Sequence, residues 1–275
     1  MASTPGAIQI RALKTIAELK AVEDLQVEVW GCSERDILPS LTIIPLLDIG
    51  GVLLGAFDEQ QLVGFVVGFP GFDAGQPILH SDMLAVRAEY RSGGLGYRLK
   101  LEQRSVALAN GIEKITWTFD PLQAANAHLN FGKLGVIADR YKVNYYGETS
   151  SALHRTGTDR LWVTWLLRSA RVKQRISAIP NSLSSDFATL PALLKVGADA
   201  EPLETAVDLT AESIRIEIPH DINTIVKMDE TLAKRWRAAT RAKFTAALAE
   251  NFVVSDFFKG PEPARPGFYL LTRPS

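Results

Sequence analysis

Cysteine is almost absent from this chain, since Cys32 is the only one among 275 residues. A single cysteine excludes an internal disulfide and gives no sign of an oxidising compartment. Histidine is also scarce: the four histidines are scattered, and together with one cysteine they give no ligand spacing typical of a metal site. We therefore expect neither a disulfide framework nor a bound metal.

An excess of charge of either sign is missing as well. The 30 basic and 31 acidic residues leave a formal net charge of −1. A nucleic-acid-binding protein needs a basic surplus to meet phosphates, so this balance argues against that class. No segment approaches the roughly 18 uninterrupted apolar residues of a membrane-spanning helix. The opening MASTPGAIQI lacks a basic stretch followed by an apolar run, so we expect no signal peptide and a cytoplasmic location.

Apolar residues make up 47% of the chain, which is enough for a substantial core. Their spacing predicts an alternation of strands and helices in the order β-α-(α)-β-β-β-α-β-α-β-β, an α/β pattern. The predicted strands are 8–13, 52–57, 62–69, 78–86, 114–119, 136–146 and 161–167, and the predicted helices are 17–30, 95–110 and 124–134. Pro39 and Pro45 are expected to break residues 33–49 into short pieces, and 70–77 to form a loop.

The sequence changes character after about residue 170. Residues 171–212 contain prolines and serines with few periodic apolar positions, and we interpret them as a linker or covering segment. Residues 213–275 predict a β-α-β-β extension, which is short for an independent domain. We expect this tail to pack on the main domain, residues 1–170, or on a partner subunit, where it would act as a dimerisation element.

The residues that carry chemistry lie in the stretch 79–100, LHSDMLAVRAEYRSGGLGYRLK. A strand is followed by a basic, glycine-rich turn that opens a helix. Glycines let the backbone approach a ligand closely because they have no Cβ. The first turn of a helix has unpaired N–H groups and a partial positive charge. This arrangement predicts an anion site that suits phosphate, with Arg91 and Arg98 adding charge.

Two other phosphate-binding loops fit this stretch less well. A dinucleotide fingerprint, G-x-G-x-x-G, would need a glycine where Leu99 stands, and the P-loop pattern is absent. The pattern that fits is R-x-x-G-x-G, filled by Arg91, Gly94 and Gly96 after a strand ending in MLAV.

With this motif the chain resembles the GNAT superfamily of acyltransferases, in which it binds the pyrophosphate of coenzyme A. The resemblance covers residues 8 to about 168 and implies a mixed, mostly antiparallel twisted sheet flanked by helices. It also implies a soluble N-acyltransferase with acetyl-CoA or succinyl-CoA as co-substrate. The coenzyme-binding residues implied in this segment are Leu84, Ala85, Val86, Arg91, Ser92, Gly93, Gly94, Leu95, Gly96 and Tyr97.

A second segment, NFGKLG at residues 130–135, is similar to the family's Y-x-K-x-G-F segment beside the coenzyme. It adds Asn126, Asn130 and Lys133 to the implied coenzyme-binding residues. Phe131 stands where many members have the tyrosine that protonates the leaving thiolate. Tyr97 and Tyr141 are candidate substitutes without motif support.

Catalysis in this family is direct attack of an amine on the thioester, so a base must take a proton from the amine. Because side chains alternate along a strand, we expect His80, Asp82, Leu84 and Val86 to share one face of the strand 78–86. His80 and Asp82 are then the candidate bases, and each has the alternative role of a hydrogen-bonded polar residue in the sheet. The oxyanion would be stabilised by a backbone N–H near 84–86.

Within the superfamily the chain resembles a long subgroup that shares the HSDML and WTFDPL segments, some of whose members are linked to N-acylation or N-succinylation of amino acids. That implies a small-molecule amine as acceptor. Its carboxylate could be held by one of four cations, Arg140, Lys142, Arg155 and Arg160. A protein N-acetyltransferase and a non-catalytic acyl-CoA sensor remain alternatives.

Overall fold

The computed structural model describes residues 7–31, 33–147, 155–177, 187, 189–206, 209–260 and 266–274. Contacts within it divide the chain into two compact units. The N-terminal unit is built on the residues up to Trp117, and the C-terminal unit on those from Thr118. This boundary falls inside a strand, whereas the sequence predicted a main domain that extends to residue 170.

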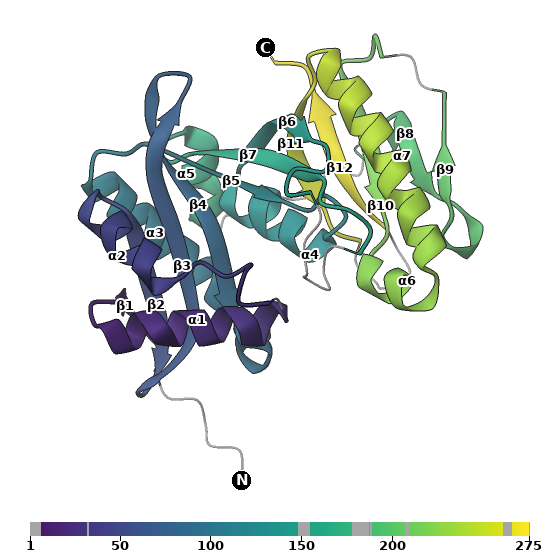
Figure 1. The fold of residues 1–275 in the computed structure, drawn as a ribbon. Helices are drawn as coiled ribbons and strands as arrows, with labels where there is room; N and C mark the ends of the chain where they lie inside the picture. Colours follow the sequence, from purple (N-terminus) through teal and green to yellow (C-terminus); the bar gives the residue numbers. More distant parts are fainter. Residues whose placement is uncertain are drawn as a thin grey trace. The chain divides into compact units, whose positions relative to one another are not determined.

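The N-terminal unit is an antiparallel sheet with helices on both faces. Helices α1 and α2 lie on one face and α3 on the other (Figure 1). Strand β5 starts in this unit and pairs with β4 in parallel. The elements are β1 (Gln9–Ala12), α1 (Ile16–Trp30), α2 (Ser40–Asp48), β2 (Val52–Asp58), β3 (Gln61–Asp73), β4 (Gln76–Val86), η1 (Ala88–Gly93), α3 (Leu95–Ala109) and β5 (Lys114–Phe119).

Helix α1 shows how the sequence defines an element. The Thr15 side chain accepts from the Glu18 N–H, and the Glu18 carboxylate accepts from the Thr15 N–H, which forms a capping box. The helix ends at Gly31, which has a φ of 58°. Its apolar stripe, with Leu19 and Val22, is buried against β2, β3 and β4, as the periodicity predicts.

Two segments of this unit differ from the sequence prediction. Pro45 lies inside the single helix α2 and does not divide residues 33–49 as expected. The expected loop 70–77 is mostly strand, because β3 and β4 continue to a tight turn at Ala74 and Gly75. Both turn residues have positive φ, the conformation that closes a two-residue hairpin.

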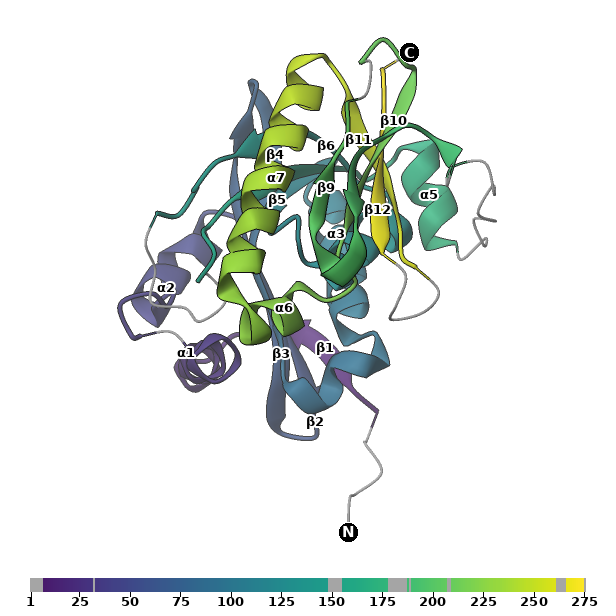
Figure 2. The same ribbon diagram turned by 90° about the vertical axis from the view of Figure 1, so that its right-hand side faces the viewer.

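The C-terminal unit is also a mostly antiparallel sheet, with strand order β7-β6-β11-β12-β10-β8-β9. Figure 2 shows α7 and α5 on opposite sides of these strands. The elements are α4 (Ala124–Ala127), the π-helix η2 (His128–Leu134), β6 (Ile137–Lys142), β7 (Arg160–Leu166), α5 (Ala170–Ile176), β8 (Ala192–Val196), η5 (Ala198–Ala200), β9 (Pro202–Glu204), β10 (Ser213–Ile218), α6 (Ile222–Met228), α7 (Glu230–Ala249), β11 (Val253–Phe258) and β12 (Gly267–Thr272).

The core of the C-terminal unit is aromatic. Tyr269, fully buried on β12, contacts the rings of Phe131, Phe244 and Phe257 in edge-to-face geometry. The predicted β-α-β-β tail is present as β10, α7, β11 and β12, with α6 added before α7. Residues 171–212, which we interpreted as a linker or covering segment, contribute most of α5 and the strands β8 and β9. Within the described residues, no helix has the length and apolar character needed to cross a membrane.

Candidate active site

The glycine-rich turn joins β4 to α3, as the sequence predicts. Strand β4 ends at Val86, a short 3₁₀ helix follows, and α3 begins at Leu95. Gly94 joins the two helices with a φ of 73°, a left-handed conformation that side chains with a Cβ rarely adopt. Glycine at this position is therefore favoured by the backbone itself.

The space in front of the turn is open. A Cβ added at Gly93 or Gly94 would meet no protein atom within 4 Å. The start of α3 has no side-chain cap and no acidic residue in its first turn. Its N–H groups and partial positive charge can therefore act on an anion in front of the turn.

The two arginines of the turn have different partners. The Nε of Arg91 donates to the carbonyl oxygen of Val86 at 2.9 Å, which holds the exposed side chain across the turn. An Nη of Arg98 donates to the carbonyl of Ile8 at 2.8 Å. Arg98 thus contacts the segment that leads into β1, whereas Arg91 stays beside the glycines. The side chain of Ser92 lies outside the described residues.

Strand β4 has a bulge at Asp82. Val67 of β3 pairs with Met83, and the next residue, Gly68, pairs with Ser81, so Asp82 has no partner in β3. A bulge residue interrupts the alternation of faces. In the part of the chain that the structure describes, parallel pairing of β4 with β5 is recorded only at Leu79 and His80.

The bulge corrects the prediction that His80, Asp82, Leu84 and Val86 share one face. His80 lies opposite Phe69, which packs on the α1–α2 side. Leu84 lies on the α3 side, where its Cδ2 would contact a Cβ at Gly96 at 3.4 Å. The extra residue in β4 therefore moves His80 to the opposite face from Leu84 and Val86. Strict alternation could not reveal this, because the sequence has no signal for the bulge.

His80 is partly buried, and its Nδ1 lies 2.9 Å from the hydroxyl oxygen of Thr116. Burial lowers the pKa of His80 to about 4, and the positive charge of Lys100 acts in the same direction. The imidazole is therefore neutral at pH 7. The Asp82 side chain is exposed to solvent. Protein atoms around its carboxyl nevertheless remove part of the surrounding water, and this desolvation raises the pKa of the carboxyl.

The glycine turn lies within a segment that matches a known protein family. The family model described as "Acetyltransferase (GNAT) family" matches residues 19–135. These residues are a GNAT acetyltransferase domain. The matched segment contains β4, the glycine turn and α3, and it ends at Gly135, the last residue of the NFGKLG segment. No curated protein matches the chain.

Solved GNAT structures are similar over just over half of the chain. The ribosomal-protein-S18-alanine N-acetyltransferase of Escherichia coli is 16% identical, with 60% of this chain and 96% of that one covered and a TM-score of 0.46. The aminoglycoside 6'-N-acetyltransferase of Enterococcus faecium is 15% identical, with coverages of 58% and 98% and a TM-score of 0.44. An aminoglycoside 6'-N-acetyltransferase complexed with coenzyme A is 14% identical, with the same coverages and TM-score.

The last part of the GNAT domain forms α4 and η2. Asn126 and Lys133 are exposed, whereas Asn130 is buried and its carbonyl accepts the N–H groups of Gly135 and Val136. Phe131, at the position of the family's usual tyrosine, is fully buried against Phe119 and Tyr269. Its ring is part of the core of the C-terminal unit.

The two tyrosines considered as substitutes differ in their surroundings. Tyr141 donates its hydroxyl to the Asp159 carboxylate at 2.8 Å, and burial raises its pKa far above the ordinary range. Tyr97, in the first turn of α3, is partly buried, and burial also raises its pKa. Tyr97 directly follows the glycine turn in the chain.

The four cations considered for a substrate carboxylate have distinct environments. Arg160 is buried, donates to the Asp159 carbonyl and lies over the Tyr146 ring. Arg140 contacts Asp139 and the ring of Trp162. Lys142 is partly buried and Arg155 is exposed. Among the described residues no cluster of three or more His, Cys, Asp or Glu could hold a metal.

Sequence reasoning missed Lys100, a fully buried lysine on α3 that reaches β4. Its Nζ donates to the Ser81 hydroxyl at 2.7 Å. Lysine is common on exposed helix faces, so nothing in the local pattern places this one in the interior. The one available signal was its position directly after the buried Leu99 in a helix that opens at the glycine turn.

Proposed function

We propose that the chain is an acyl-CoA-dependent N-acyltransferase that transfers an acetyl or succinyl group to the amine of a small metabolite, such as an amino acid. The observation that carries this proposal is the open, left-handed turn at Gly94 before an uncapped helix, within a GNAT domain. A diphosphate in front of this turn would accept N–H groups of residues 94–97 and meet the charge of Arg91.

After His80, the side of β4 that faces away from β3 has no strand partner in the described residues, and this side suits the rest of the co-substrate. Backbone groups of Leu84, Ala85 and Val86 can hydrogen-bond the pantetheine arm, because β3 is their only strand partner in the described residues. An amine then attacks the thioester carbonyl, and a backbone N–H of this stretch stabilises the oxyanion. The carbon–sulfur bond breaks, and the thiolate leaves with a proton, for which Tyr97 is the donor we favour over the buried Tyr141.

Of the two candidate bases, we favour Asp82. A base must take the proton of an amine and release it to solvent. His80, with a pKa of about 4, holds a proton poorly near pH 7, and its Nδ1 is already engaged with Thr116. Asp82 is exposed, and partial desolvation of its carboxyl raises the pKa of that group. His80 then serves as a neutral hydrogen-bonding group on the other side of the bulge.

This assignment predicts which residue causes activity to fall at low pH, which is the acid limb of the pH profile. We expect D82N to lower kcat by about 10²-fold, a usual contribution of a general base, and to remove the acid limb of the pH profile. H80Q should keep that limb, since the His80 pKa is lowered to about 4 and His80 is already neutral at pH 6. Release of free thiol between pH 4.5 and 8 measures both profiles. An acid limb that disappears in H80Q but persists in D82N contradicts the assignment.

The overall activity is tested by thiol release from acetyl-CoA and succinyl-CoA with a panel of amino acids, polyamines and aminoglycosides. We expect one acyl donor to bind at least about tenfold more tightly in calorimetry, a difference of 1.4 kcal/mol, and one acceptor class to accelerate thiol release. Tight binding without acceleration by any amine supports the acyl-CoA sensor instead. Acceleration by lysine-containing peptides alone supports a protein N-acetyltransferase. The absence of binding to either donor contradicts the proposal.

A further inference from the structure

Among the residues that the structure describes, Lys100 is buried without a counter-ion. Its side chain enters the interior of the N-terminal unit from α3, and only 4% of the residue is exposed. Among the described residues it forms no salt bridge, although buried lysines are normally paired. Burial lowers its pKa to about 7. An apolar side chain of similar length would fill this place without the cost of desolvating a charge.

The three groups around the Lys100 ammonium are all acceptors. The Ser81 hydroxyl oxygen lies 2.7 Å from Nζ, and the Gln103 Oε1 lies at 3.5 Å. The centre of the Trp117 ring lies 3.8 Å from Nζ, so the electron-rich face of the indole meets the cation. An ammonium group has three donors and no acceptor. These surroundings therefore match the protonated form of Lys100, because an ammonium group can use all three acceptors. A neutral amine has only two N–H donors, and of the three groups only the Ser81 hydroxyl could donate to its lone pair.

The position of Ser81 gives this contact a consequence for β4. Ser81 pairs with Gly68 directly before Asp82, the residue that forms the bulge. The hydrogen bond from Lys100 holds the last paired residue before the bulge against α3. The residues on the other side of the bulge, Leu84 to Val86, are those proposed to contact the thioester. A displacement at Ser81 would change the direction in which this backbone leaves the bulge.

We propose that Lys100, as an ammonium ion, is a positioning residue that fixes the β4 bulge in the geometry used for acyl transfer. This inference rests on the proposed function, because that function assigns the role of β4. Loss of the proton weakens the hold of Lys100 on Ser81, and loss of the side chain removes it. Either change lowers turnover more than it lowers the binding of the acyl donor, which depends on the glycine turn.

The other titratable and charged groups on the elements around Lys100 do not replace its role. None of them lies within salt-bridge distance of Nζ among the described residues. Asp73 and Lys114 pair with each other, and Asp58 accepts from Tyr90. The remaining groups on β4 and α3 are His80, Asp82, Tyr97, Arg98, Glu102 and Arg104. Of these, His80 is linked to Lys100 by charge, since a protonated Lys100 lowers the pKa of His80.

The kinetic test compares K100M, K100R and S81A with the unmodified chain, using acetyl-CoA and the best amine of the panel. We expect K100M to lower kcat at least about tenfold and to change the dissociation constant of acetyl-CoA less than about threefold. S81A, which keeps the lysine, should lower kcat in the same direction. The unmodified chain should lose kcat as pH rises through the Lys100 ionisation. K100R, which stays charged, should retain activity at high pH.

A second readout does not depend on acyl transfer. The amide ¹H–¹⁵N resonances of Ser81 and Asp82 should titrate with Lys100 in the ligand-free chain and not in K100R. If these resonances titrate but no acyl transfer is found, the hold of Lys100 on the β4 bulge stands, whereas the proposed function fails and with it the role of this contact in acyl transfer. If K100M folds with unchanged kcat and pH profile, or if S81A and the amide resonances show no effect, the positioning role is overturned. Should K100M not fold, S81A and K100R decide the question by the same criteria.

Discussion

G94V should weaken acetyl-CoA binding by at least about 30-fold, or roughly 2 kcal/mol, while the chain stays folded. Gly94 has a φ of 73°, which a β-branched residue adopts only with strain. The added side chain would enter the open space in front of the turn, where no protein atom lies within 4 Å. The substitution therefore meets the ligand before it meets the protein. Isothermal calorimetry with acetyl-CoA measures the loss.

The same helix provides a matched control. Gly111, just beyond the other end of α3, has a φ of 74° and no protein atom within 4 Å of an added Cβ. G111V thus introduces the same backbone strain, about 1–2 kcal/mol, away from the glycine turn. We expect it to lower stability as G94V does and to leave acetyl-CoA affinity unchanged. Equal effects of both variants on affinity would show that strain in α3, and not the turn, explains the loss.

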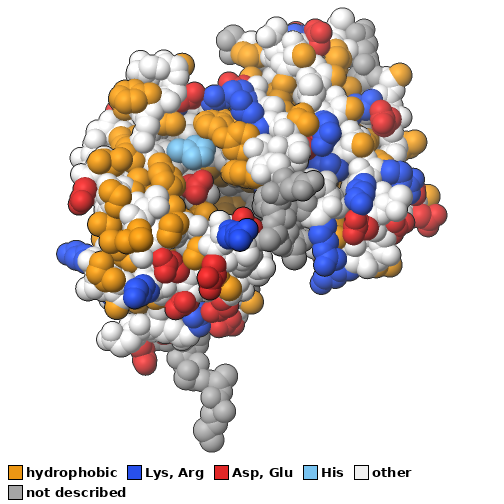
Figure 3. All heavy atoms as spheres, viewed as in Figure 1, with side chains coloured by type: hydrophobic (Ala, Val, Ile, Leu, Met, Phe, Trp, Pro, Cys, Tyr) orange, Lys and Arg blue, Asp and Glu red, His pale blue; other side chains and the backbone are white. Residues whose placement is uncertain are grey.

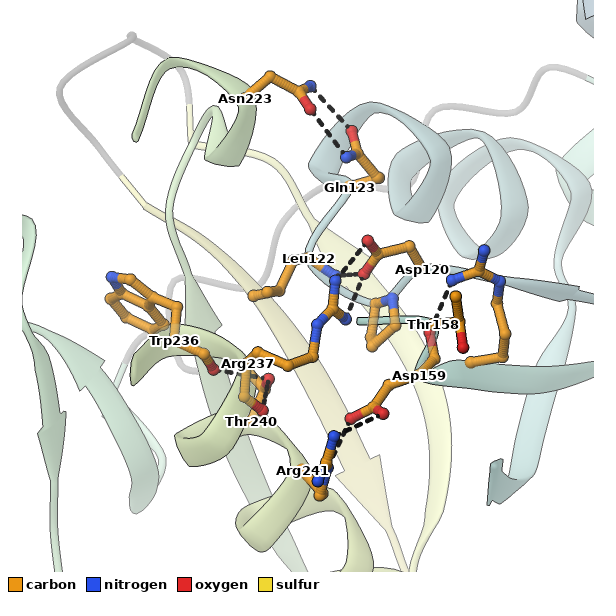
Figure 4. Close-up of polar contacts among 12 residues, drawn as sticks. Asp120, Leu122, Gln123, Thr158, Asp159, Asn223, Trp236, Arg237, Thr240 and Arg241 are labelled. Carbon is orange, nitrogen blue, oxygen red and sulfur yellow. Dashed lines mark hydrogen bonds and ion pairs between the residues drawn. The ribbon is translucent and has the colours of Figure 1, made fainter. Parts of the chain in front are cut away.

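R237M should destabilise the C-terminal unit by about 3–5 kcal/mol, the usual effect of removing one partner of a buried ion pair. Arg237 on α7 donates to both carboxylate oxygens of Asp120, at 2.7 and 2.6 Å (Figure 4). The Arg237 and Asp120 side chains are only 4% and 12% exposed. Without Arg237 the carboxylate stays buried with no cation bound to it. Urea unfolding of the unmodified chain and of R237M measures the difference between their free energies of unfolding.

Two comparisons separate this effect from simple loss of packing. The double variant D120L/R237M removes both charges and should recover much of the lost stability, because no uncompensated charge remains. R235M breaks the pair of Arg235 with Glu201, whose side chains are 51% and 42% exposed, and should cost less than about 1 kcal/mol. If R235M costs as much as R237M, or if the double variant is no more stable than R237M, burial of the Asp120 charge is not the cause.

The sequence predicted most of the regular elements because local signals agree there. The capping box at Thr15, the apolar stripe of α1 and the glycine after α3 each define a boundary through contacts within a few residues. Gly94 was identified from the local R-x-x-G-x-G motif, and the structure adds that its backbone has a positive φ. Family resemblance then supplied the expected chemistry of the turn, and the family match at residues 19–135 supports the resemblance itself.

Features that depend on contacts between distant residues could not be predicted in this way. The bulge at Asp82 arises from the register of β4 against β3, and it reversed the expected face of His80. The burial of Lys100 depends on Ser81 and Trp117, which lie on two different strands. Prolines and serines in residues 171–212 suggested a linker, whereas β8 pairs with β10 there. In each case the partner residue, and not the local pattern, determines the structure.

The exposed apolar residues of the N-terminal unit could not be predicted from the sequence either. Figure 3 shows apolar side chains spread over its visible face. Several of the exposed apolar residues lie on α1, α2 and the β3 end, namely Ile16, Val27, Leu41 and Phe72. The apolar periodicity of α1 predicted its buried stripe correctly, but it gave no means to tell which other apolar residues stay exposed.

Two basic residues of α7 have a consequence for the edge of the sheet. Arg235 and Lys243 pair with Glu201 and Glu204, which flank and end β9, the outermost strand. Both acidic partners are largely accessible to water, so mobile counter-ions compete with these contacts. Rising ionic strength would therefore loosen the attachment of β9 to α7 long before it disturbs the buried Asp120–Arg237 pair. At the outer border of the sheet the surrounding electrolyte thus weakens the charge contacts, while the backbone pairing of β9 with β8 and the buried ion pair in the interior are insulated from it.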